Sequence, residues 1–148
     1  MVIIGEWFPG DDGIERPVIR GEVMAIDGSW VSVPFLVDTG ADRTVFSAAT
    51  LAALQFPPST THERLGGLGG VVASVIIDTQ VRLAHERDKR LLFRGRYAAV
   101  TELEALDFSV LGRDVTGLFA VIVDKPSNLV CLLGQRHGYR IEERSEGL

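Results

Sequence analysis

The strongest constraint on the fold is a recurring pattern of short apolar or alternating segments, each ended by turn residues. The segment from Val18 to Ile26 alternates apolar and polar residues, as a half-buried strand does. Asp27-Gly28-Ser29 follows, and an Asp-Gly pair favours a tight hairpin turn because both central residues can adopt positive φ. Trp30 to Val37 then returns as a second strand, in which Pro34 indicates an edge or a bulge. Many short strands at close spacing predict an all-β domain, either closed or sandwiched.

The remaining segments fit the same class of fold, with room for two short helices. Ser47 to Gln55 is the better helix candidate, because it begins with a residue that can cap a helix and is followed by Pro57-Pro58. Gly112 to Leu118 can hold a second short helix. Further strands are expected over 71–83, as one strand or two, and over 91–100, 119–124, 128–133 and 139–142. The charged tail, residues 143–148, is expected to be flexible.

Length and composition are typical of one globular domain and disfavour several classes of function. The chain has 148 residues, of which 46% are hydrophobic and 24% charged, and this predicts a single domain over residues 1–148. The net charge of −5 disfavours a nucleic-acid partner. No apolar stretch is long enough to span a bilayer, and the N-terminus does not resemble a signal peptide. The single cysteine, Cys131, reads as a buried strand thiol and suits a reducing compartment, so we expect a cytoplasmic protein with no membrane partner.

The segment Phe35-Leu36-Val37-Asp38-Thr39-Gly40 carries the clearest chemical signal. An apolar strand ends abruptly on an acid, and the residues after it are a small hydroxyl, a glycine and an alanine. This order places a carboxylate at the mouth of a core, beside backbone that other groups can approach closely. Asp and Gly are also common where a strand simply ends in a turn. The segment alone therefore leaves a catalytic and a structural interpretation open.

The segment resembles the active-site loop of the retropepsin family, the retroviral-type aspartic proteases. Two further segments resemble that family and follow in the family's order. Residues 65–72 are similar to the glycine-rich tip of the flap, and residues 110–114 are similar to the apolar-Gly-Arg-Asn/Asp segment that precedes the C-terminal helix. The resemblance implies a retropepsin-like closed barrel with one or two short helices and a flap hairpin.

The resemblance also implies roles for residues in all three segments. The catalytic loop would comprise Asp38, Thr39 and Gly40, with Asp38 as the catalytic carboxylate. Gly112 would let the chain pass close to the active-site strand, and Arg113 would pair with Asp42 to brace the loop. No metal or organic cofactor is implied. The residues expected to bind substrate, with the flap closing over it and excluding water, are Ala41, Asp42, Arg43, Gly66, Gly67, Leu68, Gly69 and Gly70.

An aspartic protease needs two carboxylates that share one proton, and this chain supplies a single Asp-Thr-Gly. The segment Asp78-Thr79-Gln80 has glutamine where close approach needs glycine. A symmetric homodimer would instead bring two copies of Asp38 together, where like charges cannot both ionise easily. We therefore expect an aspartic endopeptidase that acts on peptide or protein substrates as a homodimer and is inactive as a monomer.

The sequence departs from the viral members of the family at several places. The stretch between the flap and Gly112-Arg113 is long, and the extra length around His85 to Arg96 is expected to lengthen a charged surface hairpin. Arg43 occupies a position that touches substrate in viral enzymes, where a cation could favour acidic side chains. Residues 1–10 and 140–148 match none of the terminal segments that build the viral dimer. Ala41 lacks the hydroxyl with which pepsin-like relatives stabilise the ionised acid, so we expect a pH optimum closer to neutral than pepsin's.

Other functions fit the sequence less well. The main alternative is a peptide-binding or dimerisation module that keeps the fold with little or no proteolysis, although the intact Asp-Thr-Gly-Ala argues against full decay. The glycines around Leu68 fit neither a dinucleotide fingerprint nor a phosphate loop, and a purely structural protein would leave them unexplained. The three histidines show no metal-ligand spacing.

Overall fold

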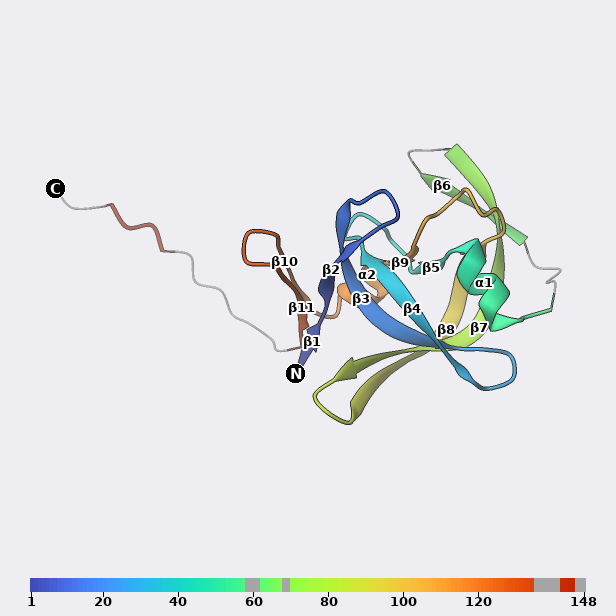
Figure 1. Cartoon of the computed structure of the whole chain (residues 1–148), viewed down its shortest axis with the longest axis horizontal. Coiled ribbons are helices and arrows are strands. Elements are labelled where there is room, and N and C mark those ends of the chain that lie inside the picture. Colours follow the sequence, from blue (N-terminus) through green and yellow to red (C-terminus); the bar gives the residue numbers. More distant parts are fainter. Residues whose placement is uncertain (58–61, 68–69, 135–141, 146–148) are drawn as a thin grey trace.

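The computed structural model describes residues 1–57, 62–67, 70–134 and 142–145, and within them the chain is mostly β-strand (Figure 1). Neither helix in this part of the chain is long and apolar enough to cross a membrane. The first half contains β1 (Val2–Ile4), β2 (Glu6–Pro9), β3 (Glu15–Met24), β4 (Trp30–Val37), β5 (Val45–Phe46), α1 (Ala48–Leu54) and β6 (His62–Gly67). The second half contains β7 (Gly70–His85), β8 (Lys89–Val100), β9 (Ser109–Leu111), α2 (Arg113–Thr116), β10 (Ala120–Asp124) and β11 (Leu129–Leu133).

One eight-stranded sheet forms a partly closed ring around the core. Its strand order is β2-β3-β4-β9-β5-β8-β7-β6, and an additional pairing between β3 and β7 closes the ring and leaves β2 and β6 outside it. The inward side chains include Ile19, Phe35, Phe46 and Leu83, each fully buried. The predicted all-β fold, a ring with two short helices, is confirmed. Strand β4, which ends just before Asp38, is part of this ring.

Local sequence accounts for the helix and turn that flank β4. Helix α1 begins after Ser47, whose side chain accepts a hydrogen bond from the Thr50 amide, and it ends at Gln55 in a left-handed conformation. In the turn after β3, only Gly28 has positive φ, at 84°. The expected hairpin turn between β3 and β4 is present. Asp27 does not use the positive φ that it could adopt, because its carboxylate accepts hydrogen bonds from the amide and hydroxyl of Ser29 and holds an ordinary turn.

Pro34 lies where β4 changes from one hydrogen-bonded neighbour to two. Strand β3 pairs with β4 along its whole length, whereas the parallel ladder with β9 begins only at Phe35, which pairs with Ser109. The proline therefore stands just before the point at which the strand becomes central, which fits the edge character expected from the sequence.

The long hairpin of β7 and β8 accounts for the extra length between the flap region and Gly112. The two strands pair from Ser74↔Val100 to His85↔Lys89, so the strands expected over 71–83 and 91–100 are both present and extend further toward the hairpin tip. At the tip, Lys89 and Glu86 form an exposed ion pair. Arg90 and Arg82 both form ion pairs with Glu22 on β3. Some basic residues of this hairpin therefore face solvent, and others bind the neighbouring strand.

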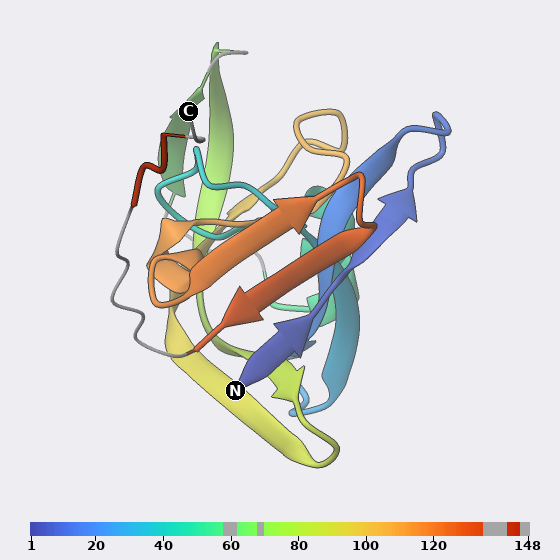
Figure 2. The same cartoon turned by 90° about the vertical axis from the view of Figure 1, so that its left-hand side faces the viewer.

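A second, three-stranded sheet contains the first strand of the chain, β1, and the last two strands that the structure describes (Figure 2). Its order is β1-β11-β10, and β1 pairs with β11 through Val2↔Leu133, Ile3↔Leu132 and Ile4↔Cys131. On its inner face Ile3, Val130 and Leu132 are buried, and its outer face is partly exposed. Cys131 is buried within β11, as expected. Of the last expected strand, 139–141 lies outside the described residues and Glu142 is not in a strand.

Candidate active site

Asp38 follows directly from the buried end of β4. Val37 pairs with Leu111 of β9, and the amide of Asp38 then donates to the carbonyl of Leu111 at 3.2 Å, so the ladder extends to the acid itself. Asp38 is half-buried, whereas Thr39 and Gly40 are exposed. The strand therefore presents a carboxylate at the surface with its backbone fixed by two neighbouring strands.

The turn after Asp38 is closed by the acid's own groups. The Gly40 amide donates to Oδ1 of Asp38 at 2.9 Å, and the Ala41 amide donates to the Asp38 carbonyl at 3.2 Å. A Cβ added to Gly40 would lie 3.2 Å from that same Oδ1, which is tighter than ordinary van der Waals contact. Glycine thus lets its amide approach the carboxylate closely, in agreement with the expectation from the Asp-Thr-Gly sequence.

Arg113, at the start of α2, holds the loop from the other side. Its guanidinium donates to the Thr39 carbonyl at 2.8 Å and forms an ion pair with the carboxylate of Asp42. Its amide donates to the Ala41 carbonyl at 2.8 Å. The pairing of Arg113 with Asp42, implied by the family resemblance, is present. Three residues of the loop are therefore tied to one arginine, whose planar, rigid head suits this geometry.

Gly112 lies against the backbone of the loop, as the resemblance implied. A Cβ added at this position would lie 2.3 Å from both the carbonyl carbon and the carbonyl oxygen of Arg43. Real Cβ atoms do not approach backbone this closely, so only glycine fits without moving the loop. Arg43 itself is exposed on the loop.

Two residues that hold the site received no firm role from the sequence. Thr44 is 1% exposed, and its amide and hydroxyl both donate to the carboxylate of Asp114. That carboxylate also accepts from the Val115 amide, and the Thr44 hydroxyl accepts from the Gly112 amide at 3.2 Å. Asp114 belongs to the segment 110–114, and the family resemblance implies no definite role for it. Thr44 follows the loop as an ordinary small polar residue, and nothing local marks it as a partner of a residue so distant in the chain.

The segment expected to act as the flap forms a hairpin whose tip lies partly outside the described residues. Strands β6 and β7 pair from His62↔Val75 to Gly67↔Gly70, and this hairpin projects beyond the ring (Figure 1). Gly66, Gly67 and Gly70 belong to its paired backbone. Leu68 and Gly69, expected to contact substrate, lie outside the described residues. The structure therefore brings Asp38 to Arg43 together with Gly112 and Arg113, and places the glycine-rich segment on a separate hairpin.

The second acidic segment of the sequence does not form a comparable loop. Asp78 lies in the middle of the continuous strand β7, where it pairs in register with Arg96 and forms an ion pair with it at 3.8 Å. Its side chain is 84% exposed. Nothing places it at the end of a buried strand, so it does not supply a second site within the chain.

A partly closed β-ring, in which a buried strand ends on a braced Asp-Thr-Gly loop, defines the class of retropepsin-like aspartic proteases. The family model described as aspartyl protease matches residues 23–136, and the chain belongs to this family. The family expected from the sequence is thereby confirmed.

Two solved structures are similar to this chain at low sequence identity, and the first named below shares its fold. A retropepsin-like aspartic protease from Rickettsia conorii is 19% identical with a TM-score of 0.54, and the match covers 89% of this chain and 88% of that one. EIAV protease complexed with the inhibitor HBY-793 is 23% identical with a TM-score of 0.49, covering 69% of this chain and 86% of that one. A search of curated proteins gave no match.

Proposed function

We propose that the protein is an aspartic endopeptidase that hydrolyses peptide bonds as a homodimer, with one Asp38 from each copy. The observation that carries the proposal is the Asp38 loop, which is placed by two strands and braced by Arg113. Bracing of this kind holds a carboxylate in one position, as acid–base chemistry requires. The other acidic candidate, Asp78, lies within a continuous strand, so the second carboxylate comes from a second copy.

In the proposed reaction the two copies of Asp38 share one proton. The ionised carboxylate accepts a proton from a water molecule, and the protonated one donates a hydrogen bond to the scissile carbonyl. Water then attacks the carbonyl carbon, and proton transfer to the amide nitrogen accompanies cleavage of the C–N bond. Two carboxylates that share one water molecule lie close enough for their negative charges to repel each other, and this repulsion keeps one of the two acids protonated.

The outer face of the three-stranded sheet is the surface we assign to the partner copy. Val2, Ile4 and Leu129 lie on this face and are 39%, 66% and 36% exposed, whereas Ile3 on the opposite face is 1% exposed. Apolar side chains that remain exposed on one face of a sheet are stabilised when a partner covers them. In this arrangement β1 and β11 pair with each other in a sheet of their own chain, and the outer face of that sheet contacts the partner copy.

The β6–β7 hairpin is proposed to act as the flap. Its glycines let the backbone come close to an extended peptide, and closure over the peptide would exclude water from the reacting groups. The backbone around Leu68, together with Ala41, Asp42 and Arg43, is proposed to bind the peptide main chain and its neighbouring side chains. The proposal includes no cofactor.

The test is a peptide-library digestion by the wild-type protein and by an Asp38→Asn variant, with an Asp78→Asn variant as the matched control. We expect cleavage by the wild type and by the control, and none by Asp38→Asn. Equal cleavage by all three proteins would refute the role of Asp38. Binding of peptides without cleavage by any of them would favour the alternative, a binding module with the protease fold.

A further inference from the structure

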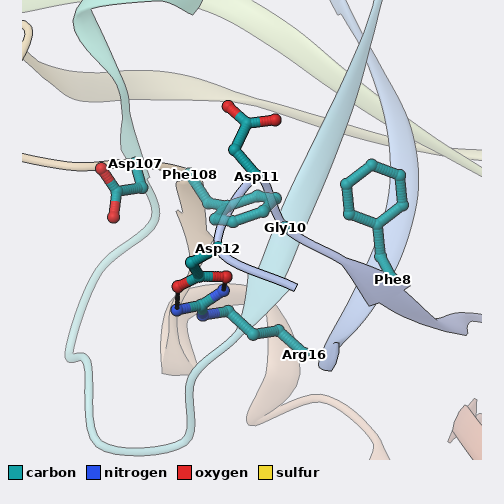
Figure 3. Close-up of a pocket in the computed structure, with 7 residues that line it drawn as sticks. All are labelled: Phe8, Gly10, Asp11, Asp12, Arg16, Asp107 and Phe108. Carbon is teal, nitrogen blue, oxygen red and sulfur yellow. Dashed lines mark hydrogen bonds and ion pairs between the residues drawn. The ribbon is translucent and has the colours of Figure 1, made fainter. Parts of the chain in front are cut away.

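A pocket opens between the β2–β3 hairpin and the segment that leads into β9 (Figure 3). Two phenylalanines, Phe8 and Phe108, form its walls, and their rings meet edge to face with centroids 6.0 Å apart. Both rings are half-buried. The polar residues that line the pocket are Asp11, Asp12, Arg16 and Asp107.

Strand register places this pocket at the end of the β3–β4 ladder that leads into Asp38. The last pair of this antiparallel ladder is Val18 opposite Leu36. Arg16 precedes Val18 by two residues and Asp38 follows Leu36 by two, so both residues lie just beyond the same end of the ladder. Phe8 pairs directly with Arg16, and Phe108 immediately precedes β9, which pairs with the other side of β4. A peptide that extends from Asp38 over this end of β3 and β4 would reach the pocket.

The charges in the pocket do not cancel. Arg16 is occupied by Asp12, with hydrogen bonds of 2.9 and 2.7 Å to its two carboxylate oxygens. Mainly because of these bonds, the pKa of Asp12 is lowered to about 2. Asp11 and Asp107 are exposed, and neither forms an ion pair with any residue that the structure describes. Three carboxylates face one guanidinium, so the pocket carries a net charge of minus two.

The aromatic walls already attract cations from the chain itself. The guanidinium carbon of Arg20 lies 5.2 Å from the centre of the Phe8 ring, and that of Arg16 lies 5.8 Å from the centre of the Phe108 ring. A ring face and an unpaired carboxylate are the two features that recognise a long cationic side chain, since the ring contacts its stem and the acid its head. A carboxylate ligand would be repelled. No group of three possible metal ligands gathers here or elsewhere in the described part of the chain.

We propose that this pocket binds a lysine or arginine side chain of the peptide substrate, so that the enzyme prefers a basic residue close to the bond it cleaves. The inference rests on the proposed protease function, because it is the peptide at Asp38 that brings a side chain to the pocket. Asp11 and Asp107 contact the cationic head and Phe8 and Phe108 contact the stem, while Asp12 holds the guanidinium of Arg16 in its ion pair.

The experiment measures binding separately from cleavage. The Asp38→Asn protein is titrated with peptides that carry lysine, norleucine or glutamate in turn at each position, and backbone amide shifts are followed by NMR. At one position we expect lysine to bind about fivefold more tightly than norleucine, with glutamate weakest, and with shifts at Phe108 and its neighbours. Asp11→Asn combined with Asp107→Asn should bring the lysine-to-norleucine ratio close to one, and added salt should reduce the ratio in the parent protein.

Two controls complete the design. Asp88→Asn, at the tip of the β7–β8 hairpin, should leave the ratio unchanged, and Asp107→Lys should turn the preference toward glutamate. The inference is overturned if peptides bind without a preference for lysine, or if the preference survives in the double variant. Digestion of the same peptides by the wild type reports separately on the proposed function. Absence of cleavage would refute the proposed protease activity, while the binding ratios would still show whether the pocket prefers a basic side chain.

Discussion

The carboxylate of Asp114 accepts hydrogen bonds from both the amide and the hydroxyl of Thr44, a residue 70 positions earlier in the chain. The hydroxyl contact measures 2.7 Å, and the amide lies 2.9 and 3.0 Å from the two carboxylate oxygens. Since the same hydroxyl accepts from the Gly112 amide, one side chain joins the end of the Asp38 loop to the start of α2. The contact is partly buried, because Thr44 is 1% exposed, and a missing partner for a buried polar group is costly.

Replacing Thr44 with valine should destabilise the protein by roughly 1–3 kcal/mol. Valine keeps the shape of threonine but leaves the Gly112 amide without its acceptor and the Asp114 carboxylate without one donor. Urea unfolding followed by circular dichroism measures the change. Thr101→Val is the matched control, because Thr101 is exposed and its hydroxyl contact is long, at 3.5 Å. An equal effect of both substitutions would contradict the assigned role of Thr44.

Replacing Gly112 with alanine should displace the loop that carries Asp38. The added methyl group would occupy space held by the Arg43 backbone, and overpacking of this kind costs about 1–3 kcal/mol. We expect a lower unfolding midpoint together with a loss of Asp38-dependent cleavage. Gly95→Ala is the control, since a Cβ at Gly95 meets nothing closer than 4.0 Å. Wild-type stability and activity in Gly112→Ala would contradict this expectation, because they would show that the loop moves to accommodate the methyl group at little cost in free energy.

Replacing Ile4 with glutamate should separate the proposed dimer. The side chain lies on the outer face of the three-stranded sheet and is 66% exposed in the single chain, so a charge there is tolerated by the monomer but not within an apolar contact. Sedimentation velocity should show a monomer, and cleavage should be lost with unfolding stability retained. Ile26→Glu, also exposed but at the turn after β3, should leave the assembly intact. A dimer that persists in Ile4→Glu would place the contact elsewhere.

The identity of residue 41 should set the pH at which the enzyme works. Ala41 offers no hydroxyl to the ionised acid, so we expect an optimum closer to neutral than that of pepsin. Ala41→Thr supplies a donor that favours the ionised form and should move the acidic limb of the rate profile to lower pH. Ala84→Thr, on an exposed part of β7, is the control. A wild-type profile that already peaks in strong acid would contradict this expectation.

Tyr97 should make the fold sensitive to alkali. Burial raises its pKa to about 12, and its hydroxyl donates to the Phe93 carbonyl at 2.7 Å. An unfolded tyrosine ionises near pH 10. Stability is therefore complete below about pH 10 and falls as pH rises toward 12, because only the unfolded state loses the proton in that range. The Tyr97→Phe variant should lose about 1 kcal/mol at neutral pH and show a weaker fall above pH 10. An unchanged alkaline transition would exclude Tyr97 as its cause.

Elements whose signals are local could be predicted from the sequence. Helix α1 has its cap at Ser47 and its stop before Pro57, and β4 occupies the expected range from Trp30 to Val37. The Asp38 loop was visible because an apolar strand meets an acid and a glycine within six residues. Each of these signals depends on the intrinsic geometry of neighbouring residues, so the sequence contains it in full.

Elements defined by distant partners were not predicted. Strands β1, β2, β5 and β9 contain two to four residues each, too few to show a period, and they exist because other strands bind them. The partner of β9, for example, is the parallel strand β4, far earlier in the chain. The role of Thr44 was not predicted for the same reason. Its contribution comes from hydrogen bonds to Asp114, and no residue near Thr44 in the sequence indicates that contact.

The pairing of β1 with β11 has a consequence for folding. Val2 to Ile4 and their hydrogen-bonding partners, Cys131 to Leu133, lie far apart in the chain. Because such a pairing closes a very large loop, the three-stranded sheet forms only when these two distant segments have been brought together. A substitution that weakens β1 should therefore also weaken the surface that we assign to the partner copy.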